Sequence, residues 1–311
     1  MAAIRLGSRG SALALTQAAL VRNGLEALGE KVELVTITTS GDERPGGVPA
    51  PEPGRGSVPE DKARFTKEIE EALLDDRIDL AVHSAKDVPG DLPEGLAIVG
   101  VPARADARDA LCGVSSLDDL PEGAAVGTAS LRRQSQLLAL RPDLEIRELR
   151  GNVDTRLRKL AGGDYDAIVL ACAGLERLER MGEGAPIAAS ELVPAAGQGC
   201  LALEARAGDT HASEVAAALT DRLALTRLTA ERALVTALGA TCHTPVGAYA
   251  ELEGETLRVS SFVGMPDGSH SIRDELEGPP GEPGELGRAA AQRLAAAGAG
   301  ELLAAADAAT I

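Results

Sequence analysis

The sequence has 311 residues and a formal net charge of −17, so it is strongly acidic and long enough for two or three domains. Aromatic residues make up 1% of it and tryptophan is absent, so the cores must be built from leucine, valine, isoleucine and alanine. The acidity and the shortage of aromatic side chains argue against a nucleic-acid ligand. Because the chain shows no bilayer-spanning apolar segment, no secretory signal and no zinc or disulfide spacing of cysteines, we expect a cytoplasmic protein without membrane contact or metal.

Short β-branched runs alternate with helical patterns through the first part of the chain. Strands are predicted at 3–6, 32–39, 79–83, 96–102, 124–128, 144–149 and 166–174, and helices at 11–28, 65–74, 131–140 and 153–161. This alternation predicts two α/β units with parallel sheets and a binding cleft between them. Ligands of such sheets usually bind in the loops that follow the carboxyl ends of the strands.

The last third of the chain differs in kind. It predicts a helix at 213–238, antiparallel strands at 246–253 and 256–265, and an alanine-rich closing helix. This pattern is typical of a small α+β domain, which we expect to begin near residue 222.

One segment, residues 41–60, predicts no regular structure, because ten of its twenty residues are glycine or proline. It is either a tolerated surface insertion or a cover over the cleft. The sequence favours neither interpretation.

Basic residues gather in the middle of this acidic chain. Residues 129–160 hold eight Arg or Lys against four Asp or Glu. An acidic protein repels anions at long range, so local arginines indicate close contact with a carboxylate or phosphate ligand. The guanidinium group suits this role because it stays charged and donates two parallel hydrogen bonds.

Hydroxyl groups and arginines recur where strands pass into helices. Thr128 and Ser130 precede Arg132 and Arg133, and the segment LRGNVDTRL repeats the arrangement with arginines on both sides of a glycine turn. The free N–H groups of a helix start favour an anion at such a place.

Two further motifs could carry chemistry. Lys86 and Asp87 follow an apolar strand directly, which is typical of either a catalytic carboxylate in a cleft or a surface ion pair of little value. Cys242 lies in a turn rich in glycine, threonine and proline and could be a nucleophile, whereas an incidental loop cysteine is the simpler interpretation. Cys112, Cys172 and Cys200 lie in apolar runs and are predicted to be buried and inert.

Eight segments together carry a specific resemblance. They are IRLGSRGSALALTQ, FTKEIEEALL, DLAVHSAKDVP, VGTASLRRQSQL, LRGNVDTRL, LACAGLERL, VPAAGQGCLALE and GATCHTPVGAYAEL. In this order they resemble the porphobilinogen deaminase (hydroxymethylbilane synthase) family over nearly the whole chain.

The resemblance implies a transferase of tetrapyrrole biosynthesis. Such an enzyme joins four porphobilinogen molecules head to tail with release of ammonia, on a dipyrromethane primer, and releases linear hydroxymethylbilane by hydrolysis. The resemblance also implies two α/β domains of the type II periplasmic-binding-protein kind, a third domain that carries the cofactor loop, and a monomer. The domains we expect are 1–102 with 200–221, 103–199, and 222–311.

The resemblance assigns roles to individual residues. It implies a thioether from the cofactor to Cys242 and a catalytic carboxylate at Asp87. The cofactor is expected to contact Ser84, Lys86, Asp87, Thr128, Ser130, Arg132, Arg133 and Arg156. The substrate is expected to contact Arg9, Ser11, Lys67, Arg150, Arg156, Arg177 and Gln198.

This chain departs from the family pattern in two places. The region EDKARFTKE lacks the glycines that usually precede the family's lysine, and the cofactor loop reads GATC where two glycines often precede the cysteine. Two other classes of protein remain as alternatives. One is a solute-binding protein on the same scaffold, and the other is a degenerate relative that no longer assembles its cofactor.

Overall fold

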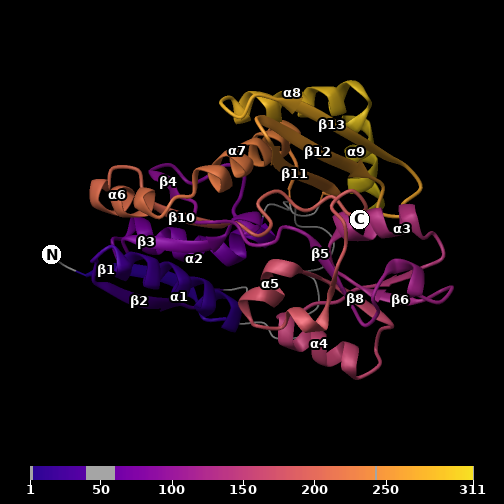
Figure 1. The fold of residues 1–311 in the computed structure, drawn as a ribbon, viewed down its shortest axis with the longest axis horizontal. Helices are drawn as coiled ribbons and strands as arrows, with labels where there is room; N and C mark the ends of the chain where they lie inside the picture. The colour runs from indigo at the N-terminus through magenta and orange to yellow at the C-terminus, as the bar shows by residue number, and fades with distance from the viewer. Residues whose placement is uncertain (1–2, 40–59, 242–243, 311) are drawn as a thin grey trace. The chain divides into compact units, whose positions relative to one another are not determined.

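The computed structural model describes residues 3–39, 60–241 and 244–310. The chain forms two compact units, which Figure 1 shows as ribbons. Unit 1 comprises Met1–Arg104 and Cys200–Leu225, and unit 2 comprises Ala105–Gly199 and Thr226–Ile311. The predicted loop at 41–60 lies outside the described residues except for Glu60, at which a helix begins. The division into three domains remains a prediction.

Unit 1 contains a five-stranded sheet in the order β2-β1-β3-β10-β4. Its strands are β1 (Ile4–Arg9), β2 (Val32–Ile37), β3 (Leu80–Ser84), β4 (Leu96–Gly100) and β10 (Leu201–Arg206). Strand β1 runs parallel to β2 and β3, whereas β10 is antiparallel to both β3 and β4. The helices of this unit are α1 (Ala12–Ala27), α2 (Glu60–Leu74) and α6 (Thr210–Ala218), and a short 3-10 turn, η1 (Ala85–Asp87), follows β3.

Helices cover both faces of this sheet. On one face Leu80 and Val82 of β3 pack in a core with residues of α1 and α6. On the other face Ala81 packs with Ile69 and Leu73 of α2. Alternate residues of β3 therefore enter different cores, which explains why the strand reads as a continuous apolar run.

Unit 2 contains a second five-stranded sheet, in the order β7-β6-β8-β5-β9. Its strands are β5 (Asp109–Cys112), β6 (Ala125–Gly127), β7 (Glu145–Arg147), β8 (Ala167–Ala171) and β9 (Ala185–Pro186). Strand β6 is parallel to β7 and β8, and β5 is antiparallel to β8 and β9. The helices are α3 (Leu131–Leu140), α4 (Val153–Ala161) and α5 (Cys172–Arg177), with 3-10 turns η2 (Leu117–Asp119) and η3 (Met181–Glu183).

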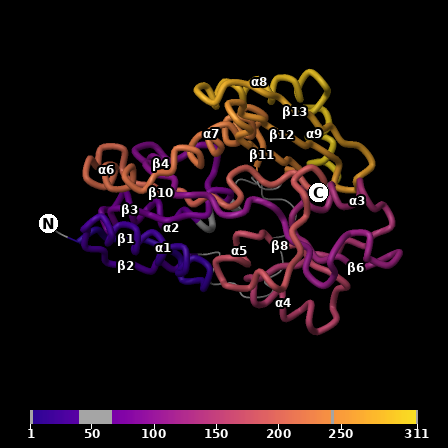
Figure 2. Tube along the Cα trace, in the orientation of Figure 1, coloured from indigo at the N-terminus to yellow at the C-terminus, as the bar shows by residue number. Residues whose placement is uncertain are grey.

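The two sheets repeat one arrangement: three parallel strands, then an antiparallel strand, then an edge strand. The path of the chain through each unit can be followed in Figure 2. The predicted class, two similar α/β units followed by a small α+β part, is confirmed.

The C-terminal part of unit 2 is a three-stranded antiparallel sheet covered by helices. Its elements are α7 (Arg222–Ala237), β11 (Val246–Glu253), β12 (Thr256–Gly264), β13 (Ser271–Gly278), α8 (Pro283–Ala296) and α9 (Ala299–Thr310). Leu234 of α7, Val259 of β12 and Leu294 of α8 meet in its core. The antiparallel pairing of the strands predicted at 246–253 and 256–265 is confirmed, and β13 is a third strand that was not predicted.

The predicted continuous helix at 213–238 is wrong, because the chain forms α6 and α7 with a break between them. Asp221 lies at the break, and its Oδ1 accepts a hydrogen bond from the N–H of Ala224 at 2.7 Å. The backbone N–H of Asp221 itself donates to Val101 O at 2.9 Å. A side chain that caps a new helix start, together with a tertiary backbone bond, ends the first helix where periodicity alone would continue it.

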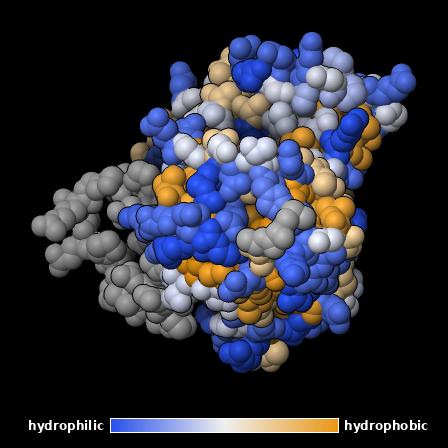
Figure 3. Space-filling view, turned by 90° about the vertical axis from the view of Figure 1, so that its left-hand side faces the viewer, coloured by the Kyte–Doolittle hydropathy of each residue, from blue (hydrophilic) through white to orange (hydrophobic). Residues whose placement is uncertain are grey.

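The surface is mixed in character. On the face shown in Figure 3, hydrophobic residues are interrupted by hydrophilic ones, as is usual for globular proteins. Among the helices in the described ranges, none has both the length and the apolarity needed to cross a membrane.

Candidate functional site

Several of the predicted site residues in unit 1 lie at one edge of its sheet. Gly7 of β1 pairs with Ala81 of the parallel strand β3, so the carboxyl ends of these two strands are adjacent. Arg9 is the last residue of β1 and Ser11 follows it, while Ser84 is the last residue of β3 and is followed by Lys86 and Asp87. The Ser11 side chain caps α1 by accepting a hydrogen bond from the N–H of Ala14 at 3.3 Å.

The Asp87 turn is held at its base. Gln17 Nε2 of α1 donates to Ser84 Oγ at 2.9 Å, and the N–H of Ala85 donates to Cys200 O at 3.0 Å. Asp87 itself is half-buried, so its carboxylate combines a fixed backbone with partial access to solvent. Lys67 is exposed on α2, and α2 packs against the turn.

Unit 2 presents a matching edge. Gly127 of β6 pairs with Arg147 of β7 and with Ile168 of β8, and all three strands run parallel. The predicted residues Thr128 and Ser130 follow β6, Arg150 and Arg156 follow β7, and Arg177 lies on α5 after β8. The register of the sheet thus brings the segments that follow these three strands, on which the five residues lie, to the same edge of unit 2.

The helix starts at this edge have the local geometry that the sequence predicts. Ser130 caps α3 by accepting from the N–H of Arg133 at 3.5 Å, and Thr128 Oγ1 accepts from the N–H of Ser130 at 3.1 Å. Asn152 caps α4 by accepting from the N–H of Thr155 at 2.9 Å. Gly151, which precedes this cap, has a φ of +119°, a conformation that side chains other than glycine rarely adopt.

The arginines at this edge have protein partners of different kinds. Arg150 Nε donates to Glu148 Oε1 at 2.6 Å, and the Arg150 side chain is 70% exposed. Arg156 Nε donates to Gly151 O at 2.7 Å, and Arg177 Nη2 donates to Gly199 O at 2.7 Å. Because exposed ion pairs are weak, Arg150 can exchange its glutamate for a ligand carboxylate at little cost.

Some arginines of the 129–160 stretch are engaged in short-range pairs. Arg141 pairs with Asp143 at 2.7 Å, and Arg147 pairs with Glu145 at 2.6 Å. The excess of basic residues there therefore overstates the number that can contact a ligand.

Arg132 and Arg133 have a different environment from the one expected of ligand-binding arginines. Both are buried and converge on the carboxylate of Asp109, which is fully buried. Arg132 Nη1 lies 2.8 Å from Asp109 Oδ2, and Arg133 Nη2 lies 2.7 Å from Asp109 Oδ1. Arg132 Nη1 also donates to Val193 O at 2.7 Å, and Arg133 Nη1 to Val169 O at 2.8 Å. Their contact with a cofactor remains a prediction.

Gln198 joins the same buried network. Its Nε2 donates to Asp109 Oδ1 at 2.9 Å and to Ala107 O at 2.7 Å. The flanking glycines, Gly197 and Gly199, have φ values of +74° and +86°, so this turn requires glycine on both sides. Buried Glu231 of α7 fixes the turn by accepting from the N–H of Gly197 at 2.7 Å.

Asp109 is the residue of this network that the sequence analysis missed. A single acid at the start of the apolar run DALC is the signal that could have identified it, because a charge in a buried strand requires partners. Burial alone would raise the pKa of Asp109, but the two adjacent guanidinium groups outweigh it and hold the pKa well below its usual range.

Replacing Asp109 by asparagine is expected to lower the free energy of unfolding by about 3–5 kcal/mol, because Arg132 and Arg133 would lose their buried counter-charge. Urea unfolding at neutral pH measures this change. Asp143→Asn, which removes an exposed partner of Arg141, is the matched control and should have a small effect. Equal effects of the two substitutions would contradict the expectation.

Because of the Asp109 carboxyl group, we expect the stability of the wild-type protein to depend on pH. The folded-state pKa of Asp109 is depressed, so its contribution is fully present above the unfolded value of about 3.9. The contribution is lost as the pH falls toward the folded-state pKa. The difference in stability between wild type and Asp109→Asn should therefore narrow in acid.

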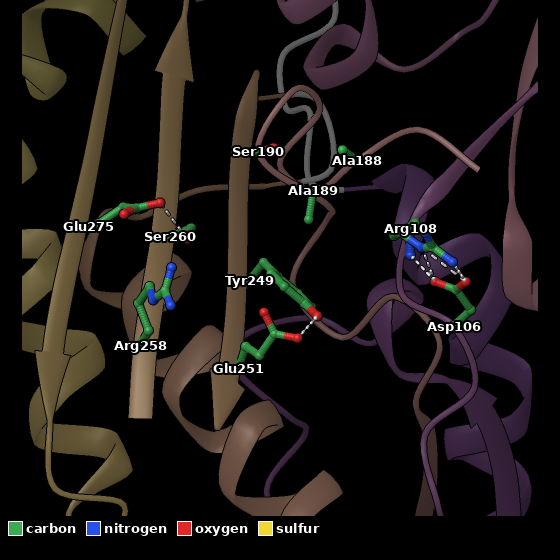
Figure 4. Close-up of a pocket in the computed structure, with 10 residues that line it drawn as sticks. All are labelled: Asp106, Arg108, Ala188, Ala189, Ser190, Tyr249, Glu251, Arg258, Ser260 and Glu275. Atoms are coloured by element: carbon green, nitrogen blue, oxygen red, sulfur yellow. Dashed lines mark hydrogen bonds and ion pairs between the residues drawn. The ribbon is translucent and has the colours of Figure 1, made fainter. Parts of the chain in front are cut away.

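A separate hollow of about 540 Å³ lies within unit 2 (Figure 4). It is lined by Asp106, Arg108, Ala188, Ala189, Ser190, Tyr249, Glu251, Arg258, Ser260 and Glu275. Three pairs form among its charged and hydroxyl groups: Arg108 with Asp106 at 2.7 Å, Tyr249 with Glu251 at 3.3 Å and Ser260 with Glu275 at 3.3 Å. None of the predicted site residues that the structure describes lines this hollow.

The three cysteines that the structure describes are buried, as predicted; they are Cys112, Cys172 and Cys200. Burial raises the pKa of Cys112 to about 11 and that of Cys172 to about 12, so both thiols are poor nucleophiles at neutral pH. Cys242 lies outside the described residues.

These features fit a ligand that carries several carboxylates. Helix starts with free N–H groups, hydroxyl side chains and arginines line the edge of unit 2, and a carboxylate and a lysine lie at the edge of unit 1. Fold and site together are those of an α/β protein whose sheet edges carry basic and hydroxyl side chains.

The chain belongs to the porphobilinogen deaminase family. Residues 4–214 match the family's dipyrromethane cofactor-binding domain, and residues 225–296 match its C-terminal domain. A porphobilinogen deaminase from Thermus thermophilus is 47% identical over 312 residues, which cover 98% of this chain and 99% of the relative. The resemblance found in the sequence motifs is thereby confirmed, as is dipyrromethane as the family's cofactor.

Some solved structures match this chain at lower sequence identity. A periplasmic substrate-binding protein of an ABC transporter from Coxiella burnetii is 14% identical, with a TM-score of 0.42 over 72% of this chain and 94% of that one. The methionine-binding protein MetQ is 15% identical, with a TM-score of 0.42 over 70% of this chain and 89% of that one. At these TM-scores the likeness says nothing about ligand or function.

Proposed function

We propose that this chain is a hydroxymethylbilane synthase. It joins four porphobilinogen molecules head to tail with release of ammonia, and hydrolysis then frees linear hydroxymethylbilane. The observation that carries this proposal is the 47% identity to a porphobilinogen deaminase over 98% of the chain. The cytoplasm as its location and the monomer as its state are part of the same proposal.

The basic residues at the edges of the two sheets bind the carboxylates of the substrate and of the growing chain. Each porphobilinogen carries an acetate and a propionate group, so the growing chain gains two negative charges with every ring. Charge-assisted hydrogen bonds contribute roughly 1.5–3 kcal/mol each, so a few arginines can overcome the general repulsion of an acidic protein. We assign this role to Arg9, Arg150, Arg156 and Arg177, supported by Lys67, Lys86 and the hydroxyl groups of Ser11, Ser84, Thr128 and Ser130.

Asp87 acts on the positive charge of the reaction. Loss of ammonia from porphobilinogen leaves an electron-poor pyrrole methylene group, and attack by another pyrrole places positive charge on a ring nitrogen. A fixed carboxylate that accepts a hydrogen bond from the pyrrole N–H stabilises both charges and can accept a proton. The side-chain hydrogen bond at Ser84 and the backbone hydrogen bond at Ala85 support this assignment, because they hold the start of the Asp87 turn in one position.

Cys242 is proposed to hold the cofactor through a thioether. When bound, dipyrromethane supplies the terminal pyrrole carbon to which the first substrate unit is joined. The predicted site residues suit such a group chemically. The arginines and helix starts of unit 2 can bind its carboxylates, and the carboxylate of Asp87 can accept hydrogen bonds from pyrrole N–H groups. Arg132, Arg133 and Gln198 complete the proposed set, acting from the buried network around Asp109.

Replacing Arg150 by leucine is expected to lower kcat/KM for porphobilinogen by roughly 10- to 100-fold, the worth of one charge-assisted hydrogen bond. Arg147→Leu is the matched control, because Arg147 also pairs with a glutamate two residues away but lies within β7 rather than after it. Steady-state kinetics on both variants measure the difference. If both substitutions change kcat/KM equally, Arg150 does not bind the substrate.

Ammonia release distinguishes the proposed function from its alternatives. Purified full-length protein incubated with porphobilinogen should release one ammonia for each substrate consumed and form a linear tetrapyrrole. A solute-binding protein would bind porphobilinogen and release none. A degenerate relative would lack the covalent dipyrromethane, which intact-protein mass spectrometry detects.

A further inference from the structure

Unit 1 contains a buried cluster of ionisable side chains that none of the proposed roles uses. His83 Nε2 lies 3.0 Å from Glu204 Oε2, and Glu70 belongs to the same cluster. The exposed fractions are 5% for His83, 0% for Glu204 and 7% for Glu70. Burial of such groups is costly even when they are paired, so the cluster is a poor device for stability alone.

The sheet register explains why these side chains meet. Glu204 of β10 pairs with Ala81 of β3, and His83 pairs with Ala202. Paired residues share a face of the sheet, so His83 and Glu204 both point to the face that contains Ala81. Helix α2 covers that face and contributes Glu70.

The cluster is incompletely satisfied. Within the described part of the chain, Nε2 of His83, both carboxylate oxygens of Glu204 and Oε1 of Glu70 make no hydrogen bond, so the 3.0 Å contact between His83 and Glu204 is close without having hydrogen-bond geometry. Burial raises the pKa of Glu70, and the neighbouring Glu204 carboxylate raises it further, against the opposing effects of Thr66 and His83. A buried group without a partner in a folded protein calls for an explanation beyond packing.

The position of the pair along β3 supplies that explanation. His83 is followed by Ser84 and then by the η1 turn, whose last residue is Asp87. Ser84 is held by Gln17, and Ala85 by the carbonyl of Cys200, four residues before Glu204. Three successive residues at the end of β3 and the start of η1 are thus held by distant segments. His83 contacts Glu204, Ser84 is held by Gln17, and Ala85 is held by Cys200.

We infer that His83 and Glu204 form a positioning pair that fixes the end of β3 from which the Asp87 turn departs. The inference rests on the proposed role of Asp87. Neither side chain contacts the substrate in this arrangement; the pair acts through the backbone that presents the Asp87 carboxylate. An error of about 1 Å in the position of a reacting group can lower a rate by about 10²-fold, so the pair matters for turnover more than for binding.

Glu204→Gln, His83→Ala and His83→Gln in the full-length protein test this inference. Glu204→Gln and His83→Ala are expected to lower kcat by roughly 10- to 100-fold, with KM for porphobilinogen and the mass of the bound cofactor unchanged. His83→Gln keeps a polar side chain with an N–H group beside Glu204, so it should recover part of the kcat that His83→Ala loses. If His83 had a purely structural role, His83→Gln and His83→Ala would have the same kcat once both were corrected for the fraction of folded protein.

Asp79→Asn is the matched control. Asp79 precedes the other end of β3, and its Oδ1 lies 2.6 Å from Arg5 Nη2. This substitution should lower the thermal midpoint without changing kcat per folded molecule. If Glu204→Gln and His83→Ala also keep the wild-type kcat per folded molecule, the inference is wrong.

Failure of the proposed function would be distinct from failure of the inference. In that case the wild-type protein itself would release no ammonia from porphobilinogen, or Asp87→Ala would remain active. With an active wild type and an inactive Asp87→Ala, the kinetics of the His83 and Glu204 variants decide the inference alone. If Glu204→Gln does not fold, the comparison of the two His83 variants decides it.

Discussion

Replacing Asp87 by alanine is expected to lower kcat by about 10³-fold or more, because the only carboxylate proposed to stabilise the cationic steps would be lost. The fold should persist, since Asp87 is half-buried on a short turn and contributes little to either core of unit 1. Rates of ammonia release and of tetrapyrrole formation measure the loss. The thermal midpoint and the far-ultraviolet circular dichroism check the fold.

Two further variants define what the Asp87 carboxylate does. Asp91→Ala removes an exposed carboxylate four residues away and should leave kcat unchanged. Asp87→Asn keeps the shape without the charge and should be nearly as inactive as Asp87→Ala, because the amide cannot offset a positive charge. Near-normal turnover by Asp87→Asn would mean that the carboxylate does not act through its charge.

Replacing Cys242 by serine is expected to abolish both the covalent cofactor and turnover. A serine hydroxyl is a far weaker nucleophile than a thiolate unless a neighbouring base activates it, so no stable attachment should form. Intact-protein mass spectrometry should find two pyrrole units on the wild type and none on the variant. Incubation of the variant with porphobilinogen should release no ammonia beyond the uncatalysed rate.

Cys112→Ala is the control for this second prediction. Cys112 is buried in β5 with a pKa raised to about 11, so it cannot compete as an attachment site. The control variant should keep the pyrrole adduct even if its stability falls. An adduct that persists in Cys242→Ser would place the attachment on another residue and would contradict the assignment.

The sequence anticipated the local features of the candidate site. Thr128 and Ser130 before α3, the glycine turn before α4 and the acidic residue after β3 are all encoded within a few residues. Strand ends and helix caps depend on neighbouring residues, so a pattern in one segment predicts them. The inert character of Cys112 and Cys172 could be predicted in the same way from their apolar surroundings.

Partners that come from distant segments could not be predicted in this way. Arg133 looks like a surface anion binder in the sequence, yet its guanidinium group pairs with Asp109, which lies 24 residues away. Likewise, nothing local to His83 indicates that it meets Glu204, because that contact depends on the antiparallel register of β3 and β10.

The sequence by itself therefore determined the α/β class, the helix starts after Ser130 and Asn152 and the family to which the chain belongs. The tertiary structure alone decided which charged side chains face one another inside the two sheets. The physical reason is the range of the interactions: capping and turn formation involve residues three or four positions apart, whereas the pairing of buried charges depends on strand order and register. The partners of Asp109 and Glu204 are consequently contacts that only the fold could reveal.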